Sequence, residues 1–205
     1  MQSSPTSAAI ALFAAAAALG SACGAQGEKP LPGANAPSTI RIAPENEPGK
    51  PLLVEGTVYA PDGETPAAGV VLYVYQTGLD GIYHGPGTSV PRLRGYMKTG
   101  VDGRYSYRTI RPGSYPESTI PAHVHTQLWG GGYEPQYNRD LNFADDPFVS
   151  EGAKRDSAAA ARFAWICDAR PDAAGLLHCT HNLKLKPHGD RFEGNIRHGL
   201  DNPKG

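Results

Sequence analysis

The sequence predicts an all-β protein, an antiparallel β-sandwich with long loops, preceded by a signal segment and a flexible tether. Three observations carry this prediction. Glycine (25 residues) and proline (19 residues) are frequent, which suits short strands joined by rigid turns better than a helical bundle. Between these turns lie short runs rich in β-branched and aromatic side chains, the usual composition of strands. An apolar run near the N-terminus supplies the signal segment.

The N-terminal segment has the composition of an export signal. Residues 8–19 form an unbroken, alanine-rich apolar run that is too short to span a bilayer but has the length of a signal-peptide core. Small residues at 20–22 then precede Cys23. We expect residues 1–23 to be a signal peptide, and leave open a lipoprotein signal with a lipid anchor at Cys23. Either form predicts an extracytoplasmic protein that is periplasmic, secreted or membrane-anchored.

Composition also predicts the domain boundaries. Residues 24–50 are rich in Gly, Pro, Ala, Asn and Glu without apolar periodicity, which indicates a flexible linker. Residues 51–186 contain the expected strands and form the single β-sandwich domain. Residues 187–205 are predicted to be a polar C-terminal tail.

Each expected strand is bounded by turn residues. Asp102-Gly103 supplies the positive φ that a tight hairpin turn needs. The last two strands are expected to pair with each other, after one short helical turn at residues 157–161. In chain order, the expected strands cover residues 52–59, 70–76, 95–99, 104–110, 124–129, 163–166 and 183–185.

Charge and cysteine content narrow the possible partners and the compartment. The net charge is −1 and the basic residues are scattered, so the sequence predicts neither a nucleic-acid-binding stripe nor a polybasic membrane segment. Cys167 and Cys179 flank the turn-rich residues 168–175. In an oxidising compartment we expect a disulfide between them, with two free thiols as the alternative.

The histidines of Pro121-Ala122-His123-Val124-His125 are candidate metal ligands. Side chains of a strand alternate between its faces, so His123 and His125 project from the same face and can converge on one ion. Tyr115 precedes them in a proline-containing loop. Two imidazoles and a phenolate favour iron(III) over zinc, because a phenolate is a hard anionic donor. The alternative is a pair of ordinary strand histidines.

The order of short motifs resembles that of the intradiol ring-cleavage dioxygenases, the family of catechol and protocatechuate 3,4-dioxygenases. Each motif is modest alone, but the ordered set covers residues 50–186. The matching pieces are residues 56–58, 66–70, 75–76, 81–84, 94–95, 99, 102–105, 109–116, 121–125 and 146–147.

The resemblance implies a mononuclear Fe(III) held by Tyr83, Tyr115, His123 and His125. It also implies a catecholic substrate and O2, with ring cleavage between the hydroxylated carbons to a muconate-type diacid. In that scheme the diol displaces Tyr83, which then accepts a substrate proton as a local base.

Two positions depart from the family pattern. Ile120 stands where the family carries an arginine, whose positive charge offers stabilisation to the activated ring. Arg139 is our candidate for a substitute catalytic cation. Asp140 falls near a position that is often glutamine. These departures keep a second hypothesis open, a non-catalytic module of the same fold that binds metal or phenolic ligands.

We expect His178 and His181 to be solvated.

Overall fold

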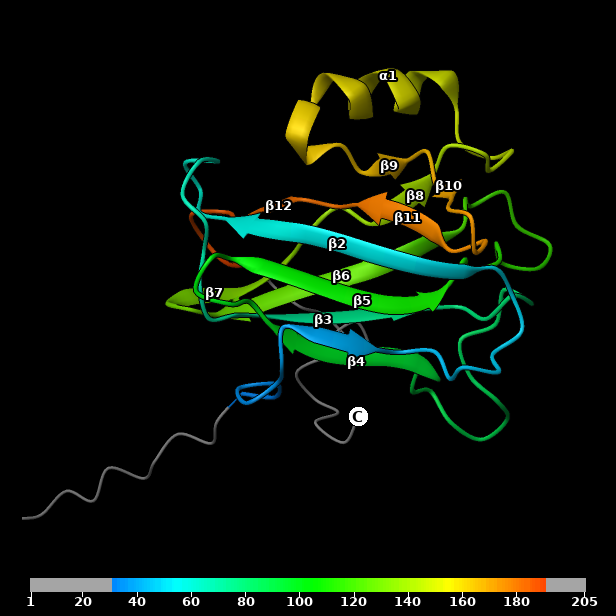
Figure 1. The fold of residues 1–205 in the computed structure, drawn as a ribbon, viewed down its shortest axis with the longest axis horizontal. Helices are drawn as coiled ribbons and strands as arrows, with labels where there is room; N and C mark the ends of the chain where they lie inside the picture. The colour runs from blue at the N-terminus through cyan, green and yellow to red at the C-terminus, as the bar shows by residue number, and fades with distance from the viewer. Residues whose placement is uncertain (1–30, 191–205) are drawn as a thin grey trace, which may run out of the picture.

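The computed structural model describes residues 31–190 and folds them into two facing β-sheets with one short helix (Figure 1). The first sheet contains, in spatial order, β1 (Thr39–Arg41), β5 (Arg104–Ile110), β2 (Pro51–Tyr59), β11 (Leu177–Thr180) and β10 (Arg170–Pro171), with β12 (Leu183–Lys184) also paired to β2. The second contains β4 (Leu93–Lys98), β3 (Val70–Gln76), β6 (His123–Gly130), β8 (Leu141–Phe143) and β9 (Ile166–Cys167), with β7 (Tyr133–Tyr137) also paired to β6.

The sandwich is confirmed, but the prediction of wholly antiparallel sheets is wrong. Among the described strands, β1 runs parallel to β5, β11 and β12 run parallel to β2, and β8 runs parallel to β9. Both sheets are therefore mixed. The expected pairing of residues 163–166 with 183–185 is also wrong, because β9 pairs with β8 and β12 with β2. Composition predicts where a strand lies, whereas its neighbour depends on long connections.

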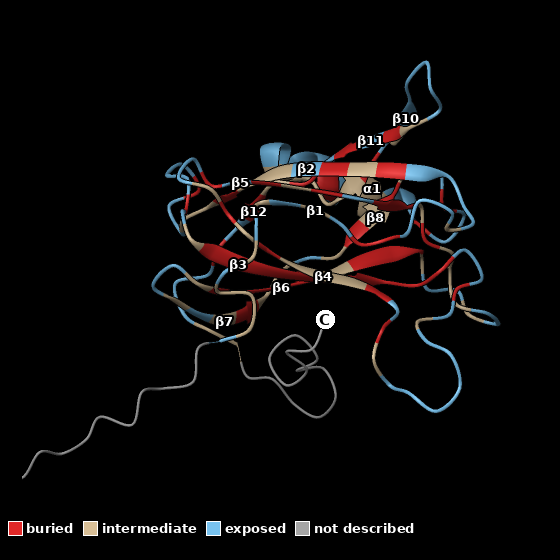
Figure 2. Cartoon of the chain, turned by 60° about the horizontal axis from the view of Figure 1, so that its bottom comes forward, coloured by how far each residue is buried: buried red, intermediate tan, exposed pale blue. Residues whose placement is uncertain are grey.

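The core lies between the sheets, and β3 is buried on both of its faces (Figure 2). Val70, Leu72 and Val74 point into the main core. The alternate residues of β3 join Trp129 in a smaller cluster on the other face of the second sheet. Loops cover this outer face of the second sheet, and the candidate site lies on it.

The folded domain extends N-terminal to Pro51, the start predicted from composition. Within the predicted linker, β1 pairs with β5, and Ile42 and Ala43 are buried. The Trp129 indole nitrogen donates a hydrogen bond to the Pro32 carbonyl at 2.9 Å. A three-residue strand is too short to produce an alternating pattern, so β1 was not predictable from the composition of this segment. The predicted signal peptide and residues 191–205 of the predicted tail lie outside the described residues.

The helix α1 (Glu151–Ala159) is longer than the single turn that the sequence predicts, and the 3-10 turn η1 (Ala161–Phe163) follows it. The Ser150 side chain caps α1 by accepting the Ala153 N–H. The Ser157 hydroxyl accepts the N–H groups of Trp165 and Ile166, each at 2.9 Å, and thereby ties the helix to β9. None of the helices in the described residues is long and apolar enough to cross a membrane.

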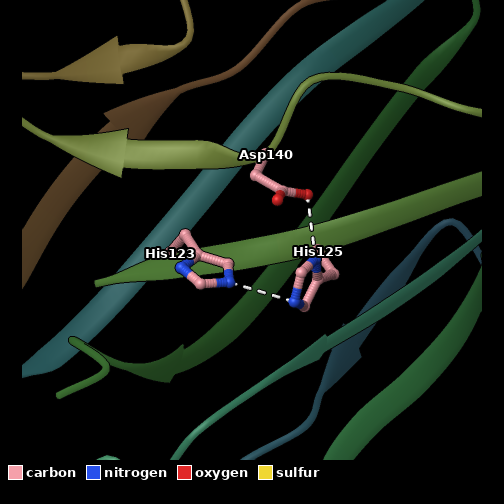
Figure 3. Close-up of side chains that lie close together, drawn as sticks. All are labelled: His123, His125 and Asp140. Carbon is pink, nitrogen blue, oxygen red and sulfur yellow. Dashed lines mark hydrogen bonds and ion pairs between the residues drawn. The ribbon is translucent and has the colours of Figure 1, made fainter. Parts of the chain in front are cut away.

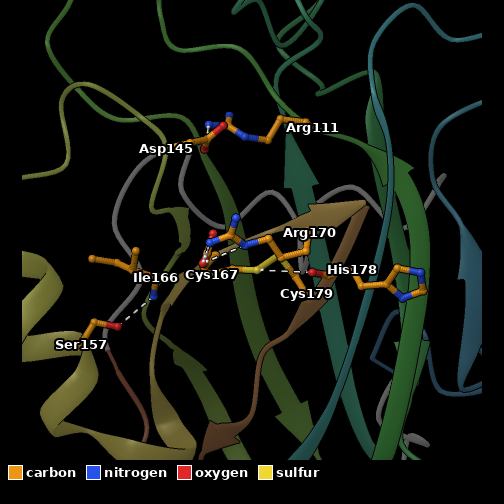
Figure 4. The surroundings of a disulfide bond; sticks show 9 residues. Arg111, Asp145, Ser157, Ile166, Cys167, Arg170, His178 and Cys179 are labelled. Atoms are coloured by element: carbon orange, nitrogen blue, oxygen red, sulfur yellow. Dashed lines mark hydrogen bonds and ion pairs between the residues drawn. A yellow bond between two sulfur atoms is a disulfide. The ribbon is translucent and has the colours of Figure 1, made fainter. Parts of the chain in front are cut away.

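Cys167 and Cys179 are joined by a disulfide (Figure 4). Cys167 belongs to β9 of the second sheet and Cys179 to β11 of the first. The bond therefore links the two sheets covalently at one edge. Arg111 lies nearby, paired with Asp145 at 2.7 Å.

Candidate metal centre

The two histidines of the site lie on a central strand. β6 pairs with β3 on one side and with β8 on the other, so the backbone around His123 and His125 is fixed from both sides. Both side chains project from the outer face of the second sheet, opposite to Val124 in the main core. Tyr75, directly across from His125 on β3, stacks on its imidazole with ring centroids 4.5 Å apart.

The two tyrosines of the site come from two loops that interlock. The Gly113 N–H donates to the Gly78 carbonyl at 2.9 Å, and the Thr77 hydroxyl donates to the Gly113 carbonyl at 2.7 Å. Gly81 adopts φ +76°, and a Cβ there would lie 2.0 Å from the Ser114 carbonyl oxygen. Only glycine permits this approach. The interlock places Tyr83 and Tyr115 on the same side of β6.

Four donor atoms converge at the site. Tyr115 Oη lies 3.1 Å from His123 Nε2, which lies 3.0 Å from His125 Nε2, which lies 2.7 Å from Tyr83 Oη. The two tyrosine hydroxyls also contact each other. Metal–ligand bonds of about 2 Å place neighbouring donors about 3 Å apart, so this spacing matches one shared ion.

Hydrogen bonds at the far side of each imidazole decide its tautomer. His123 Nδ1 lies 2.7 Å from the Pro121 carbonyl oxygen, and His125 Nδ1 lies 3.0 Å from Asp140 Oδ1 (Figure 3). Both acceptors require a proton on Nδ1, so each neutral ring presents an Nε2 lone pair to the other. Two facing lone pairs repel each other, and a cation bound by both would remove this repulsion. The donor set therefore fits a metal ion.

The surroundings of Tyr83, Tyr115 and His123 favour the neutral form of each side chain. Burial raises the pKa of Tyr83 well above its ordinary value, and the hydroxyl contact with Tyr115 raises it further. Burial also raises the pKa of Tyr115, although the same contact lowers it. The pKa of His123 is lowered, first by burial and then by His125. Two phenols and two neutral imidazoles can each bind a cation, the phenols by losing a proton.

Asp140 supports the site from outside the four donors. Its carboxylate accepts the His125 Nδ1–H, so it lies on the far side of that ring from Nε2 (Figure 3). The donor atoms of His123, His125 and Asp140 also lie within 4.8 Å of one another, which is close enough for a cation. The set with the two tyrosines explains the facing Nε2 atoms, and Asp140 then acts as the carboxylate that orients a ligating histidine.

Arg139, the predicted substitute cation, is turned away from the four donors. Its guanidinium packs over the Trp165 ring at 4.0 Å, and among the described residues it makes no contact with the predicted ligands. Asp140, the next residue in the chain, contacts His125 instead. Ile120 is 50% exposed and carries no charge.

Two features of the site differ from the sequence-based expectations. The contact between Asp140 and His125 was not predicted, because it depends on β8 lying beside β6. His181 was expected to be solvated, whereas the residue is 2% exposed. Side chains alternate between the faces of a strand, so the buried Leu177 and Cys179 predict that His181 is buried as well. This alternation is the signal from which its burial could have been predicted.

Comparison with known proteins decides the family. A family model described as "Dioxygenase" matches residues 28–187. The chain belongs to the intradiol ring-cleavage dioxygenase family. The family match begins before β1, in agreement with a folded domain that starts before Pro51.

Individual members of the family match a part of the chain. The chain is 37% identical over 108 residues to catechol 1,2-dioxygenase 1 of Acinetobacter lwoffii. The aligned region covers 43% of this chain and 34% of the relative. It is 35% identical over 104 residues to 6-chlorohydroxyquinol 1,2-dioxygenase of Cupriavidus pinatubonensis, in a region that covers 42% of this chain and 37% of the relative. The match thus spans little more than a third of the length of these relatives.

Solved structures of the family share the fold over more of the chain. The dioxygenase domain of a dioxygenase and carbohydrate-binding protein fusion from Streptomyces sp. SirexAA-E superposes with a TM-score of 0.57 at 26% identity, covering 78% of this chain and 96% of that one. Catechol 1,2-dioxygenase from Acinetobacter sp. ADP1 superposes with a TM-score of 0.55 at 24% identity, covering 75% and 59%. The latter supports the fold alone.

Proposed function

We propose that this protein is a non-haem Fe(III) intradiol-type dioxygenase that cleaves a catecholic ring between its hydroxylated carbons, using O2 and giving a muconate-type diacid. The observation that carries the proposal is the pair of facing Nε2 atoms of His123 and His125, 3.0 Å apart, with two phenols beside them. Family membership supports the same reaction class.

The donor set favours ferric iron. Tyr83 and Tyr115 would bind as phenolates, which offset two of the three charges of Fe(III) and stabilise it over Fe(II). His123 and His125 would complete the set as neutral ligands. When bound, the ion supplies Lewis acidity that withdraws electron density from a coordinated diol.

Tyr83 is suited to receive the substrate proton. It lies in the loop between β3 and β4, and its neighbours Ile82 and His84 are exposed, so a diol can approach it from solvent. Its raised pKa makes the Tyr83 phenolate oxygen a strong proton acceptor. Tyr115 and the two histidines, held by the interlocked loops and by β6, remain as the fixed part of the site.

Ile120 favours a second candidate function, an iron- or phenol-binding module without turnover. Its side chain cannot provide the charge that an arginine would offer to an activated ring. Arg139, which packs on Trp165, does not replace that charge in this conformation. The intact set of four donors favours the enzyme.

We also propose an extracytoplasmic location, as a secreted, periplasmic or lipid-anchored protein. The apolar run of residues 8–19 before Cys23 supports it. A disulfide between Cys167 and Cys179 suits an oxidising compartment.

Iron loading and oxygen uptake test the proposed function. Purified protein loaded with Fe(III) should be coloured by tyrosinate-to-iron charge transfer, and should consume O2 with catechol, a chlorocatechol or hydroxyquinol to give a diacid. Tyr115→Phe should lose the colour, while Tyr133→Phe, a control outside the site, should keep it. Colour without O2 consumption with any diol would favour the binding module. A protein that stays colourless after loading would contradict both functions.

A further inference from the structure

A cavity that none of the four donor residues lines lies where residues from both sheets meet the segment after α1. It has a volume of about 360 Å³. The second sheet contributes Arg139 from the β7–β8 connection, and the first contributes His181 and Lys184. Phe163, at the end of η1, and Trp165, just before β9, supply aromatic rings. This is the size range of small-molecule sites.

The cavity carries positive charge without a balancing carboxylate. The guanidinium carbon of Arg139 lies 4.0 Å from the Trp165 ring centroid, and the Lys184 ammonium lies 5.6 Å from that of Phe163. Neither cation has an acidic partner among the described residues, and no aspartate or glutamate of this part of the chain lines the cavity. Asp140, next to Arg139 in the chain, is turned to His125.

Polar groups that lack charge complete the cavity wall. His181 is buried, and burial lowers its pKa to about 4, so it is a neutral hydrogen-bonding group at neutral pH. Asn182 is held in place by two bonds, accepting the Thr57 N–H at 2.9 Å and donating to the Arg162 carbonyl at 3.0 Å. A ligand in the cavity would therefore contact uncharged polar groups as well as the two cations.

We propose that this cavity binds a small carboxylate with a flat, unsaturated body. The carboxylate would pair with Arg139, whose planar guanidinium offers two parallel donors, and with Lys184 as a point charge. The flat body would lie against the exposed parts of Phe163 and Trp165. Benzoate-type acids and unsaturated diacids share this chemistry. The site does not depend on iron or on the proposed dioxygenase reaction.

Calorimetric titration of the full chain tests the site. Benzoate and cis,cis-muconate are the probes, and benzamide is the uncharged match for benzoate. We expect at least one of the two acids to bind about tenfold or more tightly than benzamide, both before and after iron loading. Benzoate binding alone assigns a monoacid site, and muconate binding alone assigns a diacid site.

Charge-removing variants locate the binding. Arg139→Gln and Lys184→Gln should each weaken acid binding about tenfold or more, while Arg139→Lys should restore part of it. Lys154→Gln on the surface of α1, where Lys154 pairs with Glu151, is the matched control and should bind as the parent does. Thermal melting identifies any variant that fails to fold, and acid binding is then compared among the variants that do fold.

Three results would overturn the proposal: neither acid binding more tightly than benzamide, unchanged acid binding in both Arg139→Gln and Lys184→Gln, or binding that needs iron. The last would place the acid at the four donors. Because no oxygen uptake is measured, a protein that binds acids here but cleaves no catechol contradicts only the proposed function.

Discussion

His123 and His125 face each other through their Nε2 atoms at 3.0 Å, and each turns its Nδ1 to a separate acceptor. The acceptors, Pro121 and Asp140, come from different parts of the chain. The tautomer of both rings is thus fixed before any ligand binds, and the lone pairs are directed at a common point with the phenol oxygens of Tyr83 and Tyr115.

Iron should therefore stabilise the fold. At a free Fe(III) concentration about 100 times the dissociation constant, binding adds about 2.7 kcal/mol to the free energy of unfolding. For a domain of this size we expect a rise in melting temperature of about 5–10 °C. His125→Ala should abolish the rise, and the control His178→Ala, an exposed residue paired with Asp172, should retain it. An equal rise in both variants would mean that iron binds elsewhere.

Asp140 should tune the affinity for iron through its hydrogen bond to His125. Asp140→Asn keeps an oxygen acceptor for the Nδ1–H but loses the charge, and Asp140→Leu loses both. We expect ferric affinity to fall in that order, by about 10–100-fold for leucine, as for other carboxylates that support metal-bound histidines. Chelator competition measures this affinity. Asp145→Asn, which affects only the exposed partner of Arg111, is the control. Unchanged affinity in Asp140→Leu would show that the bond has no role.

Gly81 should be essential for bringing the two tyrosines together. Gly81→Ala would force a Cβ to within 2.0 Å of the Ser114 carbonyl oxygen, at a φ of +76° that disfavours alanine. The loops must then separate, so we expect loss of the ferric charge-transfer colour together with about 1–3 kcal/mol of stability. Gly85→Ala meets no atom within 4 Å and should keep the colour. Retained colour in Gly81→Ala would contradict the interlock.

Much of the site follows from the sequence, whereas less of the fold does. Alternation alone put His123 and His125 on one face, and the family resemblance supplied Tyr83 and Tyr115. The parallel neighbours were inaccessible, since β1 and β5 are separated by more than 60 residues of chain. The bond from Asp140 to His125 was inaccessible for the same reason, because strand pairing creates it.

Stability should decrease in weak acid because of His181. Burial lowers the pKa of His181 from 6.5 to about 4. In weak acid the unfolded chain therefore binds a proton at His181 that the folded chain does not bind. Stability from this group is therefore present above pH 6.5 and is lost as pH falls towards 4, with a loss of about 2 kcal/mol between pH 7 and pH 5. Urea unfolding of metal-free protein at the two pH values measures it.

A variant isolates this contribution from that of other groups. His181→Leu removes the titrating group and should reduce the difference between the two pH values by about 2 kcal/mol. His178→Gln, at an exposed position of the neighbouring strand β11, should leave the difference as it is. An unchanged difference in His181→Leu would assign the acid sensitivity to another residue.

The site consists of a fixed part and one adaptable residue. β6 is anchored by β3 and β8, so the imidazoles belong to the framework of the sandwich. Tyr115 is held by a loop that interlocks with the Tyr83 loop around Gly81 and Gly113 and is also tied to Asp146 through the Ser114 hydroxyl, so Tyr83 is the adaptable ligand. Exchange of a ligand at Tyr83 can therefore proceed without disturbing the sheets. The same division allows the loop sequences to change while the imidazole pair stays fixed.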